Sequence, residues 1–198
     1  KRAARLDPQT DLAGSWKEAD AASVREFSAT AYFFGKALRE TLGVPVGLIC
    51  TAFGGAACEA WMQAEWLKAF PKVKQTITEE DVKKLQQRCP TALYNGQLKP
   101  LVGYTMRGAI WYQGEDNVPR YDYYAPLMAR MIQGWREDWK QGDFPFYYCQ
   151  IAPWAYDETD WALYNSAFLR EQQEKVESMV SNCRMAVLMD TGIKDVIH

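Results

Sequence analysis

The chain has 198 residues, a formal net charge of −2 and a hydrophobic fraction of 48%, a composition typical of a globular protein with one sizeable core. Its positive charges form no run longer than local pairs such as Lys83-Lys84, so no nucleic-acid-binding surface is expected. The apolar stretches are far shorter than the roughly 20 residues that span a bilayer, so no membrane insertion is expected.

Cysteine and histidine usage argues against a metal centre. The five cysteines form no close pair and His198 is the one histidine, so we expect no structural metal such as zinc. Free buried thiols are expected, with one or two disulfides left open for an oxidising compartment. The first residues, KRAARLDPQTDL, contain no Met and no apolar leader, which fits either a removed targeting segment or a fragment.

Apolar spacing predicts helices and strands in alternation. Residues 26–43 place Phe27, Phe34 and Leu38 on one stripe, which indicates a helix that Gly43 would end. Residues 91–105 are expected to form a turn-rich connection. Further helices are expected at 63–70, 79–88, 121–142 and 160–179, and strands within 44–53, 106–117, 144–154 and 183–192.

Apolar strands that alternate with helices are typical of a parallel sheet covered by helices on both faces. No repeat or low-complexity linker interrupts the chain, so residues 1–198 are expected to form a single domain. Ligands bind such sheets at the carboxyl ends of the strands. Those ends carry TAFGGAA, YQGEDN, QIAPW and DTGIKDVIH, and a site is expected where these loops meet.

The last loop contains an Asp-x-x-His pair, Asp195 and His198. A carboxylate that fixes the tautomer of an imidazole makes it a useful general base. Any Asp three residues before a His gives the same pattern, and a solvated histidine is the commoner outcome. The pair alone therefore does not establish catalysis.

Two other loops supply candidate donors. Gly54 and Gly55 offer backbone N–H groups suited to an oxyanion hole, although a positive φ angle at a strand end explains them equally well. The Asn117 amide is a second candidate oxyanion donor. Gln113 and Glu115 are candidates for supporting the loop or contacting a substrate, because so many polar groups together are costly unless they are used.

Trp61 and Trp154 flank these loops and are candidate walls of the site, since most other aromatic residues fall on predicted core faces. A nucleophile is missing. None of the six serines lies in G-x-S-x-G or on a glycine turn at a strand end, and Cys50 lies within a predicted strand. The chain therefore contains most of a serine-hydrolase site without its serine.

These motifs resemble those of the sialate O-acetylesterase family, SGNH-type carbohydrate esterases related to acetylxylan esterases. The resemblance runs in family order from about Trp16 to His198, and two departures are Phe53, where Trp is usual, and Asp116, where Ser is usual. It rests on the stretches FSATAYFFGKALRETLGVPVGLICTAFGGAACEAWM, LYNGQLKPLVGYTMRGAIWYQGEDN, GWREDWKQGDFPFYYCQIAPW and DTGIKDVIH.

The resemblance implies a flavodoxin-like SGNH hydrolase fold, a three-layer α/β/α sandwich with a parallel sheet, here without its first strand and truncated at both ends. It implies removal of acetyl groups from sugar hydroxyls, above all those of O-acetylated sialic acid, by a serine upstream of this chain. His198 would act as the base held by Asp195, and Gly54, Gly55 and Asn117 would form the oxyanion hole. No metal or organic cofactor is implied.

Two alternatives are an acetylxylan esterase and a non-catalytic carbohydrate-binding relative. The expected partner is an O-acetylated glycan, and the oligomeric state is not readable from the sequence. Exported relatives suggest a periplasmic, secreted or lysosomal location. Without its nucleophile the chain alone is expected to be inactive, and without a central strand it is expected to aggregate.

Overall fold

The computed structural model describes residues 3–154 and 165–193. At its centre is a parallel sheet whose strands begin and end level with one another, so their carboxyl ends share one edge. The strands are hydrogen-bonded in the order β1 (Ala109–Tyr112), β2 (Phe146–Cys149) and β3 (Cys183–Ala186). The expectation of an α/β fold with a parallel sheet is confirmed.

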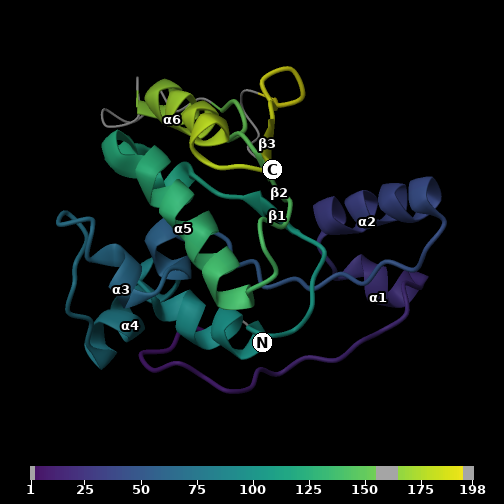
Figure 1. The fold of residues 1–198 in the computed structure, drawn as a ribbon, viewed down its shortest axis with the longest axis horizontal. Coiled ribbons are helices and arrows are strands. Elements are labelled where there is room, and N and C mark those ends of the chain that lie inside the picture. The colour runs from purple at the N-terminus through teal and green to yellow at the C-terminus, as the bar shows by residue number, and fades with distance from the viewer. Residues whose placement is uncertain (1–2, 155–164, 194–198) are drawn as a thin grey trace.

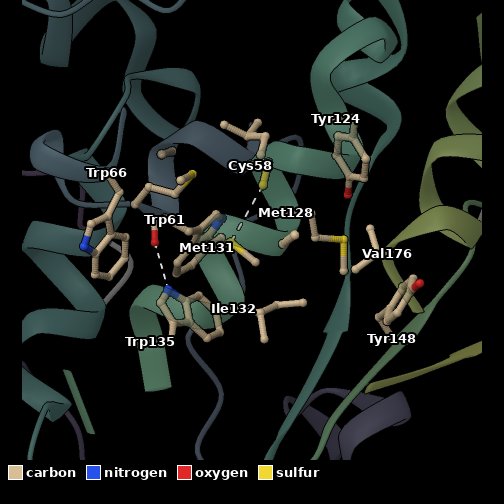
Figure 2. Packing of buried hydrophobic residues seen from close by; sticks show 14 of the residues in the cluster. Cys58, Trp61, Trp66, Tyr124, Met128, Met131, Ile132, Trp135, Tyr148 and Val176 are labelled. Atoms are coloured by element: carbon tan, nitrogen blue, oxygen red, sulfur yellow. Dashed lines mark hydrogen bonds between the residues drawn. The ribbon is translucent and has the colours of Figure 1, made fainter. Parts of the chain in front are cut away.

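Two long helices cover one face of this sheet (Figure 1). Helix α5 (Tyr124–Trp139) lies between β1 and β2 in the chain, and α6 (Asn165–Met179) precedes β3. The two helices pack against each other and against the side chains of Trp111, Phe146 and Tyr148 on the sheet. Figure 2 shows this core, in which aromatic, methionine and aliphatic side chains interlock. The expected helical cover is therefore present on this face.

Apart from the 14-residue helix α2, the remaining elements are short, and side chains set several of their ends. Ser28 caps α2 by accepting the Ala31 N–H, and Gly43 ends that helix with a φ of 67°. Thr78 and Asp81 form a capping box at the start of α4. These elements are α1 (Ala21–Arg25), α2 (Ala29–Leu42), η1 (Cys58–Trp61), α3 (Ala64–Leu67), α4 (Glu79–Leu85), η2 (Gln86–Arg88), η3 (Tyr94–Leu98), η4 (Lys99–Leu101) and η5 (Glu115–Tyr123).

Residues 44–53, expected to be a strand, form none. A strand needs a neighbour that completes its hydrogen-bond ladder, and no strand lies beside this segment among the described residues. The segment instead runs extended next to α2, where Leu48 packs so closely that a Cβ added to Gly35 would lie 2.8 Å from its Cδ1. The apolar composition predicted an extended segment but not its pairing.

Residues 91–105, expected to be turns, contain the buried π-helical turn η3. The N-terminal stretch crosses it, and the Arg5 N–H donates to the Ala92 carbonyl at 2.9 Å. Gly96 allows this crossing because a Cβ there would collide with the carbonyl oxygen of Ala3. Gly96, which suggested a turn in the sequence, therefore allows two backbone segments to approach each other closely.

The amino ends of β2 and β3 are held together by one buried guanidinium. Arg136 of α5 donates from Nη2 to the carbonyl oxygens of Phe144, Ser181 and Asn182 at 2.8, 2.9 and 3.3 Å. These carbonyls precede the two strands, at the edge opposite their carboxyl ends. A side chain of α5 thus joins the helix and two strands at the base of the sheet.

Apolar side chains remain exposed on α2 and on part of the sheet. Phe33 and Leu42 of α2 are 64% and 61% exposed, and Ile110 and Tyr147 of the sheet are 37% and 41% exposed. Large contiguous apolar patches are uncommon on monomeric proteins, and Ile110 and Tyr147 lie opposite each other on neighbouring strands. The described residues therefore include surfaces suited to burial against further protein.

We expect the 198-residue chain, produced alone, to self-associate through these side chains. Light scattering coupled to size-exclusion chromatography at increasing concentration measures the association. The double variant Phe33→Ser/Leu42→Ser is expected to raise the monomer fraction, whereas the control Lys36→Ser on the same helix is expected to leave it unchanged. A monodisperse monomer with a cooperative unfolding transition would contradict the prediction.

Candidate active site

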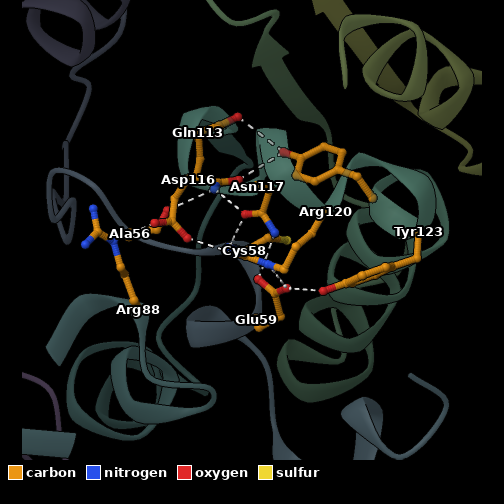
Figure 3. A network of polar contacts seen from close by, with 10 residues as sticks. Ala56, Cys58, Glu59, Arg88, Gln113, Asp116, Asn117, Arg120 and Tyr123 are labelled. Atoms are coloured by element: carbon orange, nitrogen blue, oxygen red, sulfur yellow. Dashed lines mark hydrogen bonds and ion pairs between the residues drawn. The ribbon is translucent and has the colours of Figure 1, made fainter. Parts of the chain in front are cut away.

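Two loops are joined at the carboxyl end of β1 (Figure 3). They are the glycine loop, residues 51–57, and the loop after β1, residues 113–117. Gln113 Nε2 donates to the Ala56 carbonyl at 2.9 Å, and the Cys58 N–H donates to Asn117 Oδ1 at 2.9 Å. Both contacts link segments more than fifty residues apart in the chain. Side-chain amides of one loop thus satisfy the backbone of the other.

The amide groups of Gln113 and Asn117 have defined orientations. Asn117 Oδ1 also accepts from Gln113 Nε2 at 2.7 Å, and Gln113 Oε1 accepts from the Tyr124 hydroxyl at 3.0 Å. With two donors on Oδ1, Asn117 directs Nδ2 toward Glu59 Oε2 at 2.9 Å. Asn117 is fully buried, so a substrate oxygen reaches its amide only after the surrounding loops shift.

Glu59 is a buried carboxylate at the centre of an ion network, with 3% of its surface exposed. Its Oε1 accepts from the Tyr123 hydroxyl at 2.9 Å and lies 3.5 Å from Arg120 Nε. Burial, reinforced by the Glu59 charge, raises the pKa of Tyr123. Donors contact both oxygens of Glu59, and these contacts compensate the buried carboxylate for the loss of water.

Asp116 bridges two arginines beside this carboxylate (Figure 3). Its Oδ2 accepts from Arg120 Nη2 at 2.8 Å, and its Oδ1 lies 2.5 Å from Arg88 Nε. Burial opposes the charge on Arg120, but the carboxylates of Glu59 and Asp116 outweigh it and raise the pKa of the guanidinium. The charge of Asp116, the residue next to Asn117, is therefore balanced by its ion pairs with two arginines.

The other predicted site residues lie in different surroundings. Gly54 and Gly55 are exposed, and Gly55 has a φ of 70°, so both explanations of the pair are compatible with the structure. Glu115 Oε1 accepts from the Tyr112 hydroxyl at 2.6 Å, which links the loop to the end of β1. Trp154 is exposed. Asp195 and His198 lie outside the described residues.

Trp61 lies in the core and not at the surface. It is 4% exposed and meets Trp111 edge to face with ring centroids 6.0 Å apart. Its carbonyl accepts from Trp135 Nε1 at 3.0 Å (Figure 2). Because η1 buries this ring beneath the glycine loop, the structure gives Trp61 a packing role and not that of a wall open to a ligand.

Glu59, Arg88 and Arg120 were not predicted to belong to this site. The sequence held one signal for Glu59. It is the one charged residue in residues 56–62, a run of otherwise small or apolar side chains. A charge in such a run indicates a buried network. No comparable signal marks Arg88, because its partner Asp116 lies far away in the chain.

No side chain among the described residues is placed as an activated nucleophile. Cys58 contacts this network, but burial, reinforced by the charge of Glu59, raises the pKa of its thiol well above the ordinary value. Ser28 caps α2, Ser23 pairs with the N-cap Asp20 in the capping box of α1, and the remaining serines lie outside both loops. All five cysteines are free.

Within residues 3–154 and 165–193, no three His, Cys, Asp or Glu side chains gather to hold a metal ion. In the same two ranges, no helix combines the length and the apolar character needed to cross a bilayer.

The fold matches that of a carbohydrate acetylesterase. The crystal structure of a carbohydrate acetylesterase from Xanthomonas citri matches this chain with a TM-score of 0.86 and 35% sequence identity, covering 100% of this chain and 43% of that chain. The family described as carbohydrate esterase, sialic acid-specific acetylesterase, matches residues 9–197, and the chain belongs to it.

Curated relatives agree with this assignment. The human sialate O-acetylesterase is 34% identical over 134 residues, which cover 63% of this chain and 25% of the human protein. The mouse sialate O-acetylesterase is 27% identical over 185 residues, which cover 74% of this chain and 34% of the mouse protein. The chain therefore spans between a quarter and about a third of these relatives.

Proposed function

We propose that this chain is part of a carbohydrate O-acetylesterase that removes acetyl groups from O-acetylated sialic acid. Membership of the sialic acid-specific acetylesterase family supports the reaction and the substrate. The observation that carries the proposal is the contact between the glycine loop and the loop after β1, made by Gln113 with Ala56 and by Asn117 with Cys58. Exposed N–H groups of the glycine loop then stand beside a polar loop at the ligand-binding edge of the sheet.

In the proposed reaction, a serine from outside these 198 residues attacks the acetyl carbonyl. His198 accepts the serine proton, and Asp195 holds the imidazole in the required tautomer. The N–H of Gly54 or Gly55 stabilises the negative oxygen of the tetrahedral intermediate, and the buried Asn117 amide contributes once the surrounding loops have shifted. His198 then protonates the sugar oxygen as its bond to the acetyl carbon breaks, which leaves the acetyl group on the serine. Water, deprotonated by the same histidine, attacks this acetyl-serine, and acetate leaves as His198 returns the proton to the serine oxygen.

We also propose that residues 1–198 form one domain unit of a longer protein that supplies this serine. Two facts support the proposal. The chain covers 43% of the structure that it matches over its whole length. In addition, neither loop of the candidate site contains a serine.

Acetate release by the full-length protein tests the function. We expect faster release from O-acetylated sialic acid than from acetylated xylan, and loss of release after treatment with a serine-directed fluorophosphonate. Release from xylan alone would reassign the substrate to xylan. Binding of either glycan without any release of acetate would instead identify a non-catalytic relative and overturn the proposal.

A further inference from the structure

We infer that Arg88 recognises the carboxylate of the substrate and makes the site selective for acidic over neutral acetylated sugars. The inference rests on the proposed function and adds the residue that would carry its specificity. It is based on the position, the anchoring and the exposure of this one guanidinium.

Arg88 lies beside the glycine loop. Helix η2 runs along that loop, and the Ala57 N–H donates to the Gln87 carbonyl at 3.3 Å. A Cβ added to Gly55 would lie 3.6 Å from Gln87 Nε2 and 4.0 Å from Arg88 Nη2. The guanidinium is thus a neighbour of the backbone that is proposed to bind the oxyanion.

Asp116 anchors Arg88 at one end of its guanidinium. The ion pair joins Arg88 Nε to Asp116 Oδ1 at 2.5 Å, while Arg120 holds the other carboxylate oxygen. Asp116 is itself nearly buried, with 11% of its side chain exposed, so it forms a fixed support. The residue that departs from the family pattern, Asp116 in place of Ser, therefore positions an arginine.

The outer nitrogens of Arg88 remain available to a ligand. Its side chain is 59% exposed, and its outer nitrogens have no acceptor among the described residues. Two Nη groups in the plane of one guanidinium match the two oxygens of a carboxylate. Because Asp116 has already fixed the plane of the group, less side-chain freedom is lost when an anion binds.

The charges around this position tolerate an anion. In the network, the carboxylates of Glu59 and Asp116 are balanced by Arg120 and Arg88. An open depression of about 470 Å³ borders the glycine loop at Phe53 and reaches η2 at Gln86. Its charged lining residues are Arg5, Lys83 and Glu79, which leaves an excess of positive charge. Space for a sugar ring and an excess of positive charge therefore lie next to η2, the helix that carries Arg88.

Sialic acid carries a carboxylate that acetylated xylose lacks, so one matched substrate pair isolates the effect. We would measure acetate release by the full-length protein from O-acetylated sialic acid and from the methyl ester of its carboxyl group. We expect kcat/KM to be about tenfold higher for the acid than for the methyl ester. The variant Arg88→Gln is expected to abolish this preference, mainly by raising KM for the acid.

Two further variants complete the test. Arg88→Lys keeps the charge but not the planar pair of donors, and we expect it to retain part of the preference. Arg107→Gln removes an exposed arginine before the amino end of β1 and is expected to leave the preference intact. If wild type releases acetate equally from both substrates, or if Arg88→Gln keeps the preference, this inference is wrong and the proposed esterase function stands. If wild type releases acetate from neither substrate, both are wrong.

Discussion

Replacing Glu59 by Ala is expected to destabilise the full-length protein by about 3 kcal/mol. The carboxylate is the acceptor for the Asn117 amide, the Tyr123 hydroxyl and the Arg120 guanidinium, and the substitution removes it from a nearly closed site. Arg120 keeps its contact with Asp116 and is part-exposed, which limits the loss. The cost therefore comes mainly from burying the Asn117 and Tyr123 donors without an acceptor.

Denaturant unfolding of the full-length protein, followed by tryptophan fluorescence, measures this change. The matched control is Glu65→Ala, because Glu65 is an exposed carboxylate whose ion pair with Lys68 contributes little. We expect the control to change the free energy of unfolding by less than about 0.5 kcal/mol. Glu59→Gln retains one acceptor oxygen and should fall between the two. A Glu59→Ala protein as stable as the control would show that the network does not support the fold.

Replacing His198 by Ala is expected to lower kcat for acetate release by about 10³-fold or more. The proposed base accepts a proton from the serine and donates it to the departing sugar oxygen, so both steps slow when the base is absent. Binding of the acetylated sugar does not require the imidazole, so KM is expected to change much less. Steady-state kinetics on the full-length protein separate the two effects.

Chemical rescue distinguishes a base from a structural residue. Added imidazole is expected to restore part of the His198→Ala rate, because a free base can occupy the vacated space. It is not expected to restore Asp195→Asn, in which the histidine is still present but held in the wrong tautomer. Unchanged turnover in His198→Ala would remove this residue from the mechanism, and a loss of turnover with a lower melting temperature and no rescue would indicate a structural role.

The sequence predicted most helices and the paired strands, because their signals are local. Gly43 marked a helix end that the structure shows. The prediction of a strand at residues 44–53 was wrong, because a strand forms only where a neighbouring strand completes its hydrogen bonds. The buried turn η3 was missed because Gly96 is there for a chain crossing that no local pattern reveals.

The site was predictable in its loops but not in its ion pairs. Position after a predicted strand was enough to single out Gln113 and Asn117, and the structure joins their loop to the glycine loop. The bridge from Asp116 to Arg88 depends on how η2 folds back over that loop, and sequence spacing carries no such information. Trp61 was misplaced for the same reason, because a residue next to a loop can face either the solvent or the core.

The hydrogen bonds of Arg136 stabilise the amino ends of β2 and β3, whereas the candidate site lies at the carboxyl ends of the strands. Its three acceptors are backbone carbonyls, which every residue type supplies, so substitutions at Phe144, Ser181 or Asn182 leave the acceptors in place. At the opposite edge, by contrast, each ion pair depends on two particular side chains. Partial opening is therefore expected to begin at the carboxyl edge of the sheet, and the molecule can lose its proposed oxyanion donors while the base of the sheet stays closed. Substitutions in the loops that are proposed to bind the sugar can therefore accumulate while the strands keep their register.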